Sequence, residues 1–180
     1  AVQAYFLYDG NTGYLMCCNY VHDAGTNPSL QDRTNSSFPL LGSSTLGTNE
    51  SGTQYWGHVR GGTNGVGAFG TVDMVRWYGK ASGHSRVIHF QHNNSGTLTY
   101  ANTGSGNHSG LNNGGQNNLT GHNANLPNVA DAIGSGWTGF PYYRGGQYHW
   151  GLKGGNRWEV DDYQNNENQH TLHRVWVRYS

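Results

Sequence analysis

The sequence predicts an all-β protein: a single antiparallel β-sandwich or jelly-roll-like domain over residues 1–180, with long Gly/Asn-rich loops. The 180 residues include 29 glycines, which together with frequent asparagines favour turns and disfavour helices. The 12 Tyr, 6 Trp and 5 Phe belong to residue types that are enriched in strands. No Ala-, Leu- and Glu-rich stretch alternates with the strand-like runs, as a parallel α/β fold would require. A β-prism or another closed β architecture is the alternative.

Short runs rich in aromatic and β-branched residues mark the expected strands. Each run is bounded by Gly, Asn, Asp or Ser, which are turn formers. In chain order the expected strands are 2–8, 13–21, 53–60, 71–79, 86–92, 97–101, 147–153, 157–161 and 173–179. The first two are joined by Asp-Gly-Asn-Thr-Gly, which predicts a β-hairpin.

The segments between these runs predict loops. Residues 22–52 and 102–125 show no sustained periodicity and are expected to be long surface loops. The one expected helical turn covers 126–133. The segments 54–62 and 147–155 share Gln-Tyr, Trp-Gly and Gly-Gly. This similarity predicts either equivalent hairpins in two halves of the fold or coincidence in a Gly/Tyr/Trp-rich chain.

Charge is sparse and balanced, with ten Lys and Arg against ten Asp and Glu. Nucleic-acid binding needs clustered cations that neutralise phosphates, so it is not expected. No apolar run approaches the length of a membrane-spanning helix, so membrane insertion is not expected either. A start at Ala1 rather than Met, together with N-x-S/T sequons, predicts a secreted glycoprotein. The sequons are at Asn35, Asn49, Asn93, Asn107 and Asn118.

Cys17 and Cys18 are the two cysteines of the chain, and they are adjacent. Neighbouring Cα atoms lie about 3.8 Å apart, below the usual range for a disulfide, so a bond between them would be strained. In a regular strand their side chains would point to opposite faces, which predicts one buried and one exposed thiol. Two unpaired thiols, a vicinal disulfide and a bridge to another subunit stay open as alternatives.

An acidic stretch, 157–170, concentrates carboxylates between aromatic residues and a run of amides. It holds four of the ten Asp and Glu residues of the chain: Glu159, Asp161, Asp162 and Glu167. Alternation along a strand predicts that Trp158 and Val160 enter the core. The same alternation predicts that Glu159 and Asp161 face outward, side by side.

The hexapeptide Glu-Val-Asp-Asp-Tyr-Gln, 159–164, resembles the E-x-D-x-x-E catalytic motif of laminarinase-like glycoside hydrolases. In that family the first Glu is the nucleophile and the last Glu is the acid/base, so the resemblance implies a nucleophilic Glu159. Gln164 occupies the acid/base position, and an amide cannot donate and recover a proton. Glu159 with Asp161 is the alternative carboxylate pair, because residues i and i+2 of a strand lie about 6.5–7 Å apart.

The same stretch is a candidate calcium site. Ca²⁺ binds about six to eight oxygen atoms, which carboxylates and amides of one loop can supply together. The expected metal ligands are Asp161, Asp162 and Glu167, with neighbouring asparagines completing the shell.

The stretch is also a candidate sugar site. A sugar presents hydroxyl groups, which carboxylates and amides bind, and an apolar C–H face, which stacks on an aromatic ring. The expected ligand-binding residues are His149, Trp150, Trp158, Glu159, Asp161, Asp162, Asn165 and Asn166. The alternative is a hydrated hairpin end whose aromatic side chains all lie in the core.

These features together predict a secreted, non-catalytic lectin that binds glycans or glycoproteins. Binding with Ca²⁺ as a cofactor and binding without any cofactor stay open as alternatives. Because single sugar sites are weak, the protein is expected to be a homo-oligomer that presents several sites. One alternative is an extracellular structural or matrix protein that assembles through its Gly/Asn/Tyr-rich surface. Another is a glycoside hydrolase that uses Glu159 and Asp161.

Overall fold

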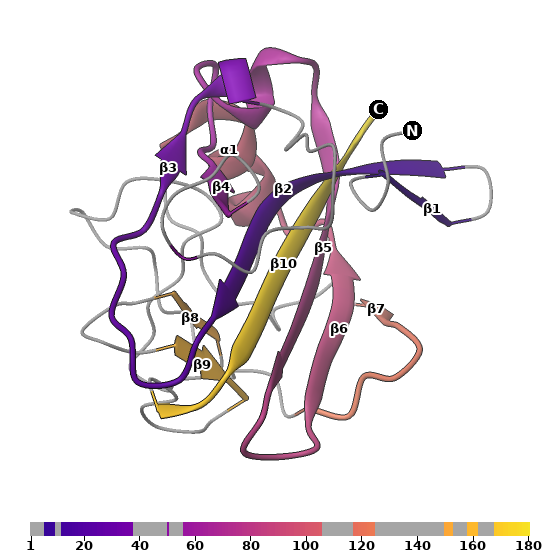
Figure 1. Cartoon of the computed structure of the whole chain (residues 1–180). Helices are drawn as coiled ribbons and strands as arrows, with labels where there is room; N and C mark the ends of the chain where they lie inside the picture. Colours follow the sequence, from indigo (N-terminus) through magenta and orange to yellow (C-terminus); the bar gives the residue numbers. More distant parts are fainter. Residues whose placement is uncertain are drawn as a thin grey trace.

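A computed structural model describes residues 6–9, 12–37, 50, 56–105, 117–124, 150–152, 158–161 and 168–180 (Figure 1). Strands predominate among these residues, so the prediction of an all-β protein is confirmed. The elements are β1 (Phe6–Asp9), β2 (Thr12–His22), β3 (Asp32–Arg33), η1 (Asn35–Ser37), β4 (Gly57–Val59), η2 (Val66–Ala68), β5 (Val72–Ala81), β6 (Val87–His92), α1 (Ser95–Thr103), β7 (Asn117–Asn118), β8 (Trp150–Leu152), β9 (Trp158–Val160) and β10 (Thr171–Tyr179).

Eight of the strands form one large sheet. Seven of them follow the order β3-β4-β2-β10-β5-β6-β7, and β1 pairs with β2. The pairs are antiparallel except for β3 with β4, which is parallel. The last strand, β10, lies between β2 and β5, so a strand from the start of the chain and the strand at its end are neighbours in the middle of the sheet (Figure 1). β8 and β9 form a separate two-stranded sheet.

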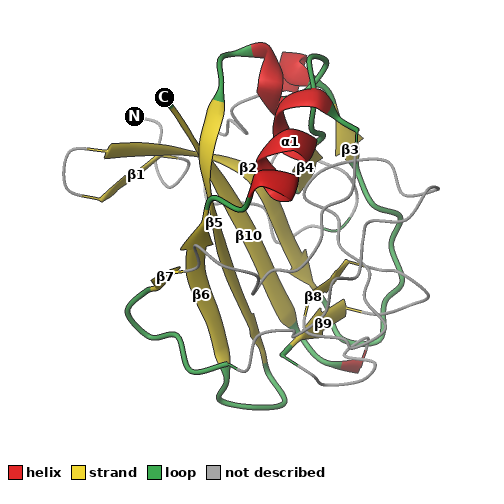
Figure 2. Cartoon of the chain, turned by 180° about the vertical axis from the view of Figure 1, so that it is seen from behind, coloured by secondary structure: helices red, strands yellow, loops and turns green. Residues whose placement is uncertain are grey.

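The large sheet has one face against which α1, β8 and β9 lie, called here the inner face (Figure 2). Side chains from its central strands and from β8 and β9 are fully buried there and form the core. The largest are Tyr20, Trp56, Trp77, Phe90, Trp150 and Trp158. Each such side chain stabilises the fold by roughly 1.5–3 kcal/mol through burial. The opposite face of the large sheet is called the outer face.

A β-bulge in β2 explains why both cysteines are buried. Val175 of β10 pairs with Cys18, and the next residue pairs with Met16, so Cys17 is an extra residue in β2. Both thiols are buried and neither forms a disulfide. The prediction of one buried and one exposed thiol is wrong, because it assumed an uninterrupted alternation that a bulge breaks.

Residues 97–101, which were expected to form a strand, lie in α1. The helix begins after Asn94, whose side chain accepts a hydrogen bond from Gly96 N at 2.9 Å. It ends at Gly104, which has a left-handed φ of 72° and donates its N–H to the Tyr100 carbonyl. Both ends are thus capped, and the caps together with packing against β5 outweigh the strand preference of Thr and Tyr.

The two similar segments, 54–62 and 147–155, do not form equivalent hairpins. β4 of the first segment lies between β3 and β2 in the large sheet, whereas β8 of the second pairs with β9 in the small one. The expected helical turn, 126–133, lies outside the described residues. Within the described ranges, no helix is both long and apolar enough to span a membrane.

Candidate ligand-binding face

The predicted sugar site falls partly on β8 and β9, and its described members are all buried. Trp150 is 1% exposed and Trp158 is 0% exposed, so neither indole is an open stacking surface. Glu159 and Asp161 are 1% and 0% exposed, so the prediction that both face outward is wrong. The other candidates lie outside the described residues: His149, Asp162, Asn165, Asn166 and Glu167.

All three residues of β9 are buried, and aromatic and imidazole rings of the large sheet pack around Trp158. Trp158 stacks on His22, with ring centroids 4.6 Å apart and planes 10° apart. His173 Nε2 donates a hydrogen bond to the Glu159 carbonyl at 2.8 Å. His84 Nε2 donates another to the Val160 carbonyl at 3.0 Å. These two imidazoles tie the β9 backbone to β10 and to the β5–β6 turn.

Asp161 follows β9 in a left-handed backbone conformation, with a φ of 54°. Its Oδ2 lies 3.0 Å from Arg86 Nε, so the carboxylate has a cationic partner. The described residues contain no group of three or more side chains that could hold a metal ion. Asp162 and Glu167, the other predicted calcium ligands, are outside those residues, and the calcium site stays a prediction.

A second polar group on the inner side joins the loop after β2 to Glu50. The Glu50 carboxylate accepts hydrogen bonds from His22 Nδ1 and from Asp23 N, both at 2.8 Å. It also accepts one from the Thr26 hydroxyl. A carboxylate beside an imidazole is a pair used in acid–base catalysis. Here the imidazole is sealed under Trp158, and the pair fixes the loop.

The outer face carries a line of polar and aromatic side chains across four strands. The register pairs Asn19 of β2 with Arg174 of β10, Arg174 with Tyr78 of β5, and Tyr78 with His89 of β6. Paired residues on neighbouring strands point to the same side of a sheet. Asn19, Arg174, Tyr78 and His89 therefore form one row, called here the cross-strand row. With strands about 4.8 Å apart, the row is about 14 Å long.

Contacts along the cross-strand row hold its side chains in place. Arg174 Nε donates a hydrogen bond to Asn19 Oδ1 at 3.2 Å. The rings of Tyr78 and His89 meet edge-on, with centroids 5.4 Å apart. His89 Nδ1 donates to the Thr120 carbonyl at 2.8 Å, so in the neutral ring Nε2 is a hydrogen-bond acceptor.

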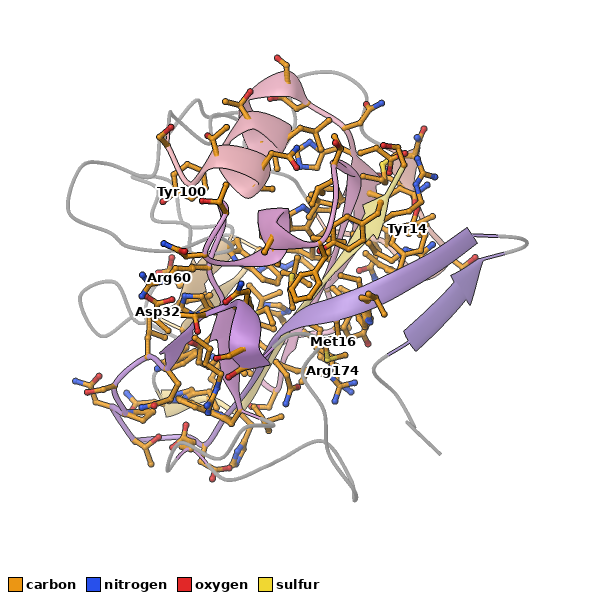
Figure 3. The ribbon with its side chains drawn as sticks, turned by 90° about the horizontal axis from the view of Figure 1, so that it is seen from above. Tyr14, Met16, Asp32, Arg60, Tyr100 and Arg174 are labelled. Carbon is orange, nitrogen blue, oxygen red and sulfur yellow. The ribbon has the colours of Figure 1, made fainter. Side chains whose placement is uncertain are left out.

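The cross-strand row is accessible on the outer face. Arg174, Tyr78 and His89 are partly exposed, whereas Asn19 is buried. Figure 3 shows Arg174 projecting away from the body of the molecule, on the side opposite to Tyr100 of α1. Parts of Arg174, Tyr78 and His89 thus reach solvent on the same face.

The four strands of the row carry more positive than negative charge. They hold four basic residues and one carboxylate, all on or beside the outer face: Arg76, Lys80, Arg174, Arg178 and Asp73. Asp73 binds Arg178, with nitrogen–oxygen distances of 2.7 and 3.0 Å. Arg76 is buried under the Tyr14 ring, 4.8 Å from its centroid. Lys80 and Arg174 have no carboxylate within ion-pair distance in the part of the chain that the structure describes.

The cross-strand row was not found from the sequence. Alternation along strands places Tyr78, His89 and Arg174 each on the less buried side of its own strand. It does not tell which strands are neighbours or in which register they pair, and these two facts create the row. No signal in the sequence would have joined Asn19 to the other three.

No protein-family model matches the chain, and no curated protein or solved structure is significantly similar to it. Function therefore has to be inferred from the geometry and chemistry of these side chains.

Proposed function

We propose that this protein is a non-catalytic carbohydrate-binding protein and that the cross-strand row is its binding site. The observation that carries the proposal is the partly exposed Tyr78 ring, flanked by the Arg174 guanidinium and the His89 imidazole. The C–H face of a sugar ring stacks on a tyrosine ring, while its hydroxyls accept from Arg174 and donate to His89 Nε2.

The rigidity of the site supports the proposal. Its residues stand on the long strands β2, β5, β6 and β10, whose backbones are fixed by the central ladders of the sheet. A preformed site loses little conformational entropy when it binds, which matters for a ligand as weakly bound as a sugar. Stacking and hydrogen bonding are both available without movement of the backbone.

The predicted residues 148–168 are not the site in this proposal. A stacking platform must be exposed, and Trp150 and Trp158 are in the core. The hydrolase alternative gains nothing from Glu159 and Asp161, because a polysaccharide has to reach a catalytic carboxylate and both are buried.

Other predictions belong to the same proposal. They are secretion, glycosylation at the sequons, calcium binding and homo-oligomer formation that raises avidity. The finer architecture is also proposed: an antiparallel sandwich of jelly-roll-like type, in which the large sheet is one layer. A structural or matrix protein is the competing function, and the same outer face would then contact protein.

The test is binding of the full chain to an array of immobilised neutral and acidic oligosaccharides. Tyr78→Ala is expected to weaken binding about 5- to 10-fold, which corresponds to the loss of roughly 1–1.5 kcal/mol of stacking. Phe69→Ala is the matched control, because Phe69 is an exposed ring, 54% accessible, outside the row. A ligand that binds the folded protein should also raise Tm. Retention of no saccharide, or equal losses in both variants, would reject the proposal.

A further inference from the structure

The outer face holds cations that the described part of the chain does not neutralise. The protein as a whole is balanced, with ten basic and ten acidic residues. The four strands of the row nevertheless contain four basic residues and one carboxylate. Asp73 is engaged by Arg178, which leaves Arg174 and Lys80 to face a ligand. Both lie next to Tyr78, Arg174 as its cross-strand partner and Lys80 two residues further along β5.

The Arg174 guanidinium is oriented for an external partner. Its Nε is occupied by Asn19 Oδ1 at 3.2 Å, and Asn19 is itself buried, so the plane of the guanidinium is set. The two terminal nitrogens, Nη1 and Nη2, form a planar fork. Such a fork binds the two oxygens of a carboxylate through parallel hydrogen bonds, a geometry that a lysine ammonium cannot reproduce.

The environment of Arg174 makes an anion a favourable ligand. Burial lowers the pKa of its guanidinium, because partial desolvation disfavours the charged form. A carboxylate from a ligand would provide the counter-charge, and charge-assisted hydrogen bonds are about twice as strong as neutral ones. Lys80, which is exposed, adds a second positive charge on the same face.

We infer that the outer face selects anionic saccharides, with the Nη fork of Arg174 binding the carboxylate of a hexuronate whose ring stacks on Tyr78. This inference rests on the proposed carbohydrate-binding function and names its ligand class. His89 receives a hydroxyl of the next sugar unit along the row, and Lys80 attracts a neighbouring carboxylate of the same polymer. The accessible part of the row, from Arg174 to His89, covers two strand spacings, about 10 Å, which is comparable to two sugar rings.

The experiment compares galacturonate trisaccharide with its methyl ester by isothermal titration calorimetry at 150 mM NaCl. The two probes share ring, linkage and hydroxyls, and differ only in charge at the carboxyl group. The free acid is expected to bind at least 10-fold more tightly than the ester. Arg174→Gln is expected to abolish this preference while changing the affinity for the ester less than 2-fold. Arg174→Lys keeps the positive charge and removes the planar fork, and this variant is expected to lose most of the preference for the free acid.

Arg60→Gln is the matched charge control. Arg60 forms an ion pair with Asp32 at the far edge of the sheet, so its loss removes the same charge without touching the row. It is expected to leave the preference for the acid unchanged. Should Arg174→Gln fail to fold, as judged by circular dichroism, Arg174→Lys and Lys80→Gln provide the same comparison.

The outcomes separate the two proposals. Equal affinity for acid and ester, or an equal effect of Arg60→Gln and Arg174→Gln, overturns the selection of uronates while leaving carbohydrate binding intact. Failure of both probes and of every saccharide on the array overturns carbohydrate binding itself. Dextran sulfate serves as a third probe. Simple ion exchange would give three results: binding to dextran sulfate is lost on addition of salt, it is unchanged by Arg174→Lys, and galacturonate is not preferred over the ester. These results together would also overturn the inference.

Discussion

A Cβ atom placed on Gly79 would lie 2.9 Å from Cζ3 of Trp150, so the indole of β8 rests directly on the backbone of β5. The Cβ would also lie 3.4 Å from Cγ2 of Val160 in β9. A residue without a side chain is therefore what lets the small sheet pack against the large one. Val160 belongs to β9, so the same contact also places β9 against β5.

Gly79→Val is expected to destabilise the protein by about 1–3 kcal/mol, because the added methyl groups overlap Trp150 and force the small sheet outward. Urea denaturation followed by tryptophan fluorescence measures the change. Lys80→Val is the control, since Lys80 is the exposed neighbour on the same strand. It should shift stability by less than about 0.5 kcal/mol. Equal effects of the two variants would mean that β8 does not pack on Gly79.

Trp158→Phe is expected to lower stability by about 1–3 kcal/mol without changing saccharide affinity. The smaller ring leaves a cavity beside Tyr20 and His22, which the indole fills. Binding should stay within 2-fold of the unaltered protein, since Trp158 does not reach the surface. A large loss of affinity at unchanged stability would instead restore Trp158 as part of the ligand site.

Asn19→Asp is expected to weaken binding of galacturonate by about 10-fold, because the new carboxylate would pair with Arg174 and compete with the ligand. The change is nearly isosteric, so the position of Arg174 is preserved. Affinity for the methyl ester, titrated in parallel, should change less than 2-fold. Unchanged affinity for the acid would mean that Arg174 does not contact the carboxylate.

Three buried imidazoles make the folded state sensitive to acid. Burial lowers the pKa of His58 to about 3, of His92 to about 4 and of His173 to about 3. An unfolded histidine titrates near 6.5, so between these values the unfolded chain binds more protons than the folded one. Stability is therefore full above about pH 6.5 and falls as the pH drops, by about 1.4 kcal/mol per pH unit for each imidazole.

Urea midpoints measured at pH 7.5, 6 and 5 should decrease in that order. His92→Phe removes one of the three titrating groups and places a ring of similar shape beside Trp77 and Phe90. The slope of stability against pH should fall in this variant, by up to about 1.4 kcal/mol per pH unit. A slope that does not change would show that folding does not lower the pKa of His92.

Cys17 and Cys18 are expected to be inert toward a thiol reagent until the protein unfolds. Burial raises the pKa of both thiols, so neither the reactive thiolate nor access to it is available. Ellman's reagent should label neither cysteine in the native protein and two per chain in guanidinium chloride. Rapid labelling of one thiol in the native protein, or none after unfolding, would contradict the buried, unpaired state.

β6 is a strand that the sequence placed well, and it has one buried and one less buried side. β6 shows this alternation along its whole length, because only Ile88, Phe90 and His92 enter the core. β9 shows where alternation fails, because Trp158, Glu159 and Val160 are all buried. The pattern of apolar residues reports the period of a strand, and it does not report what covers its polar side.

Burial in the predicted sugar site was misjudged for a related reason. Acidic and aromatic residues close together in sequence suggested a ligand site. The described members of that group, Trp150, Trp158, Glu159 and Asp161, are all buried in the folded protein. The row on the outer face instead unites residues far apart in the chain. Arg174 and Asn19, which share a hydrogen bond, are separated by 155 positions.

The sequence by itself determined the class of fold, the neutrality of the chain and the approximate positions of β2, β5, β6 and β10. These properties follow from composition and local periodicity, which need no knowledge of distant contacts. Only the tertiary structure decided that Glu159 and Asp161 are buried, that α1 replaces an expected strand, and that Tyr78 has Arg174 and His89 beside it. Strand pairing and layer packing depend on contacts between segments that are far apart in the chain. A local sequence pattern does not specify which segments pair or pack together.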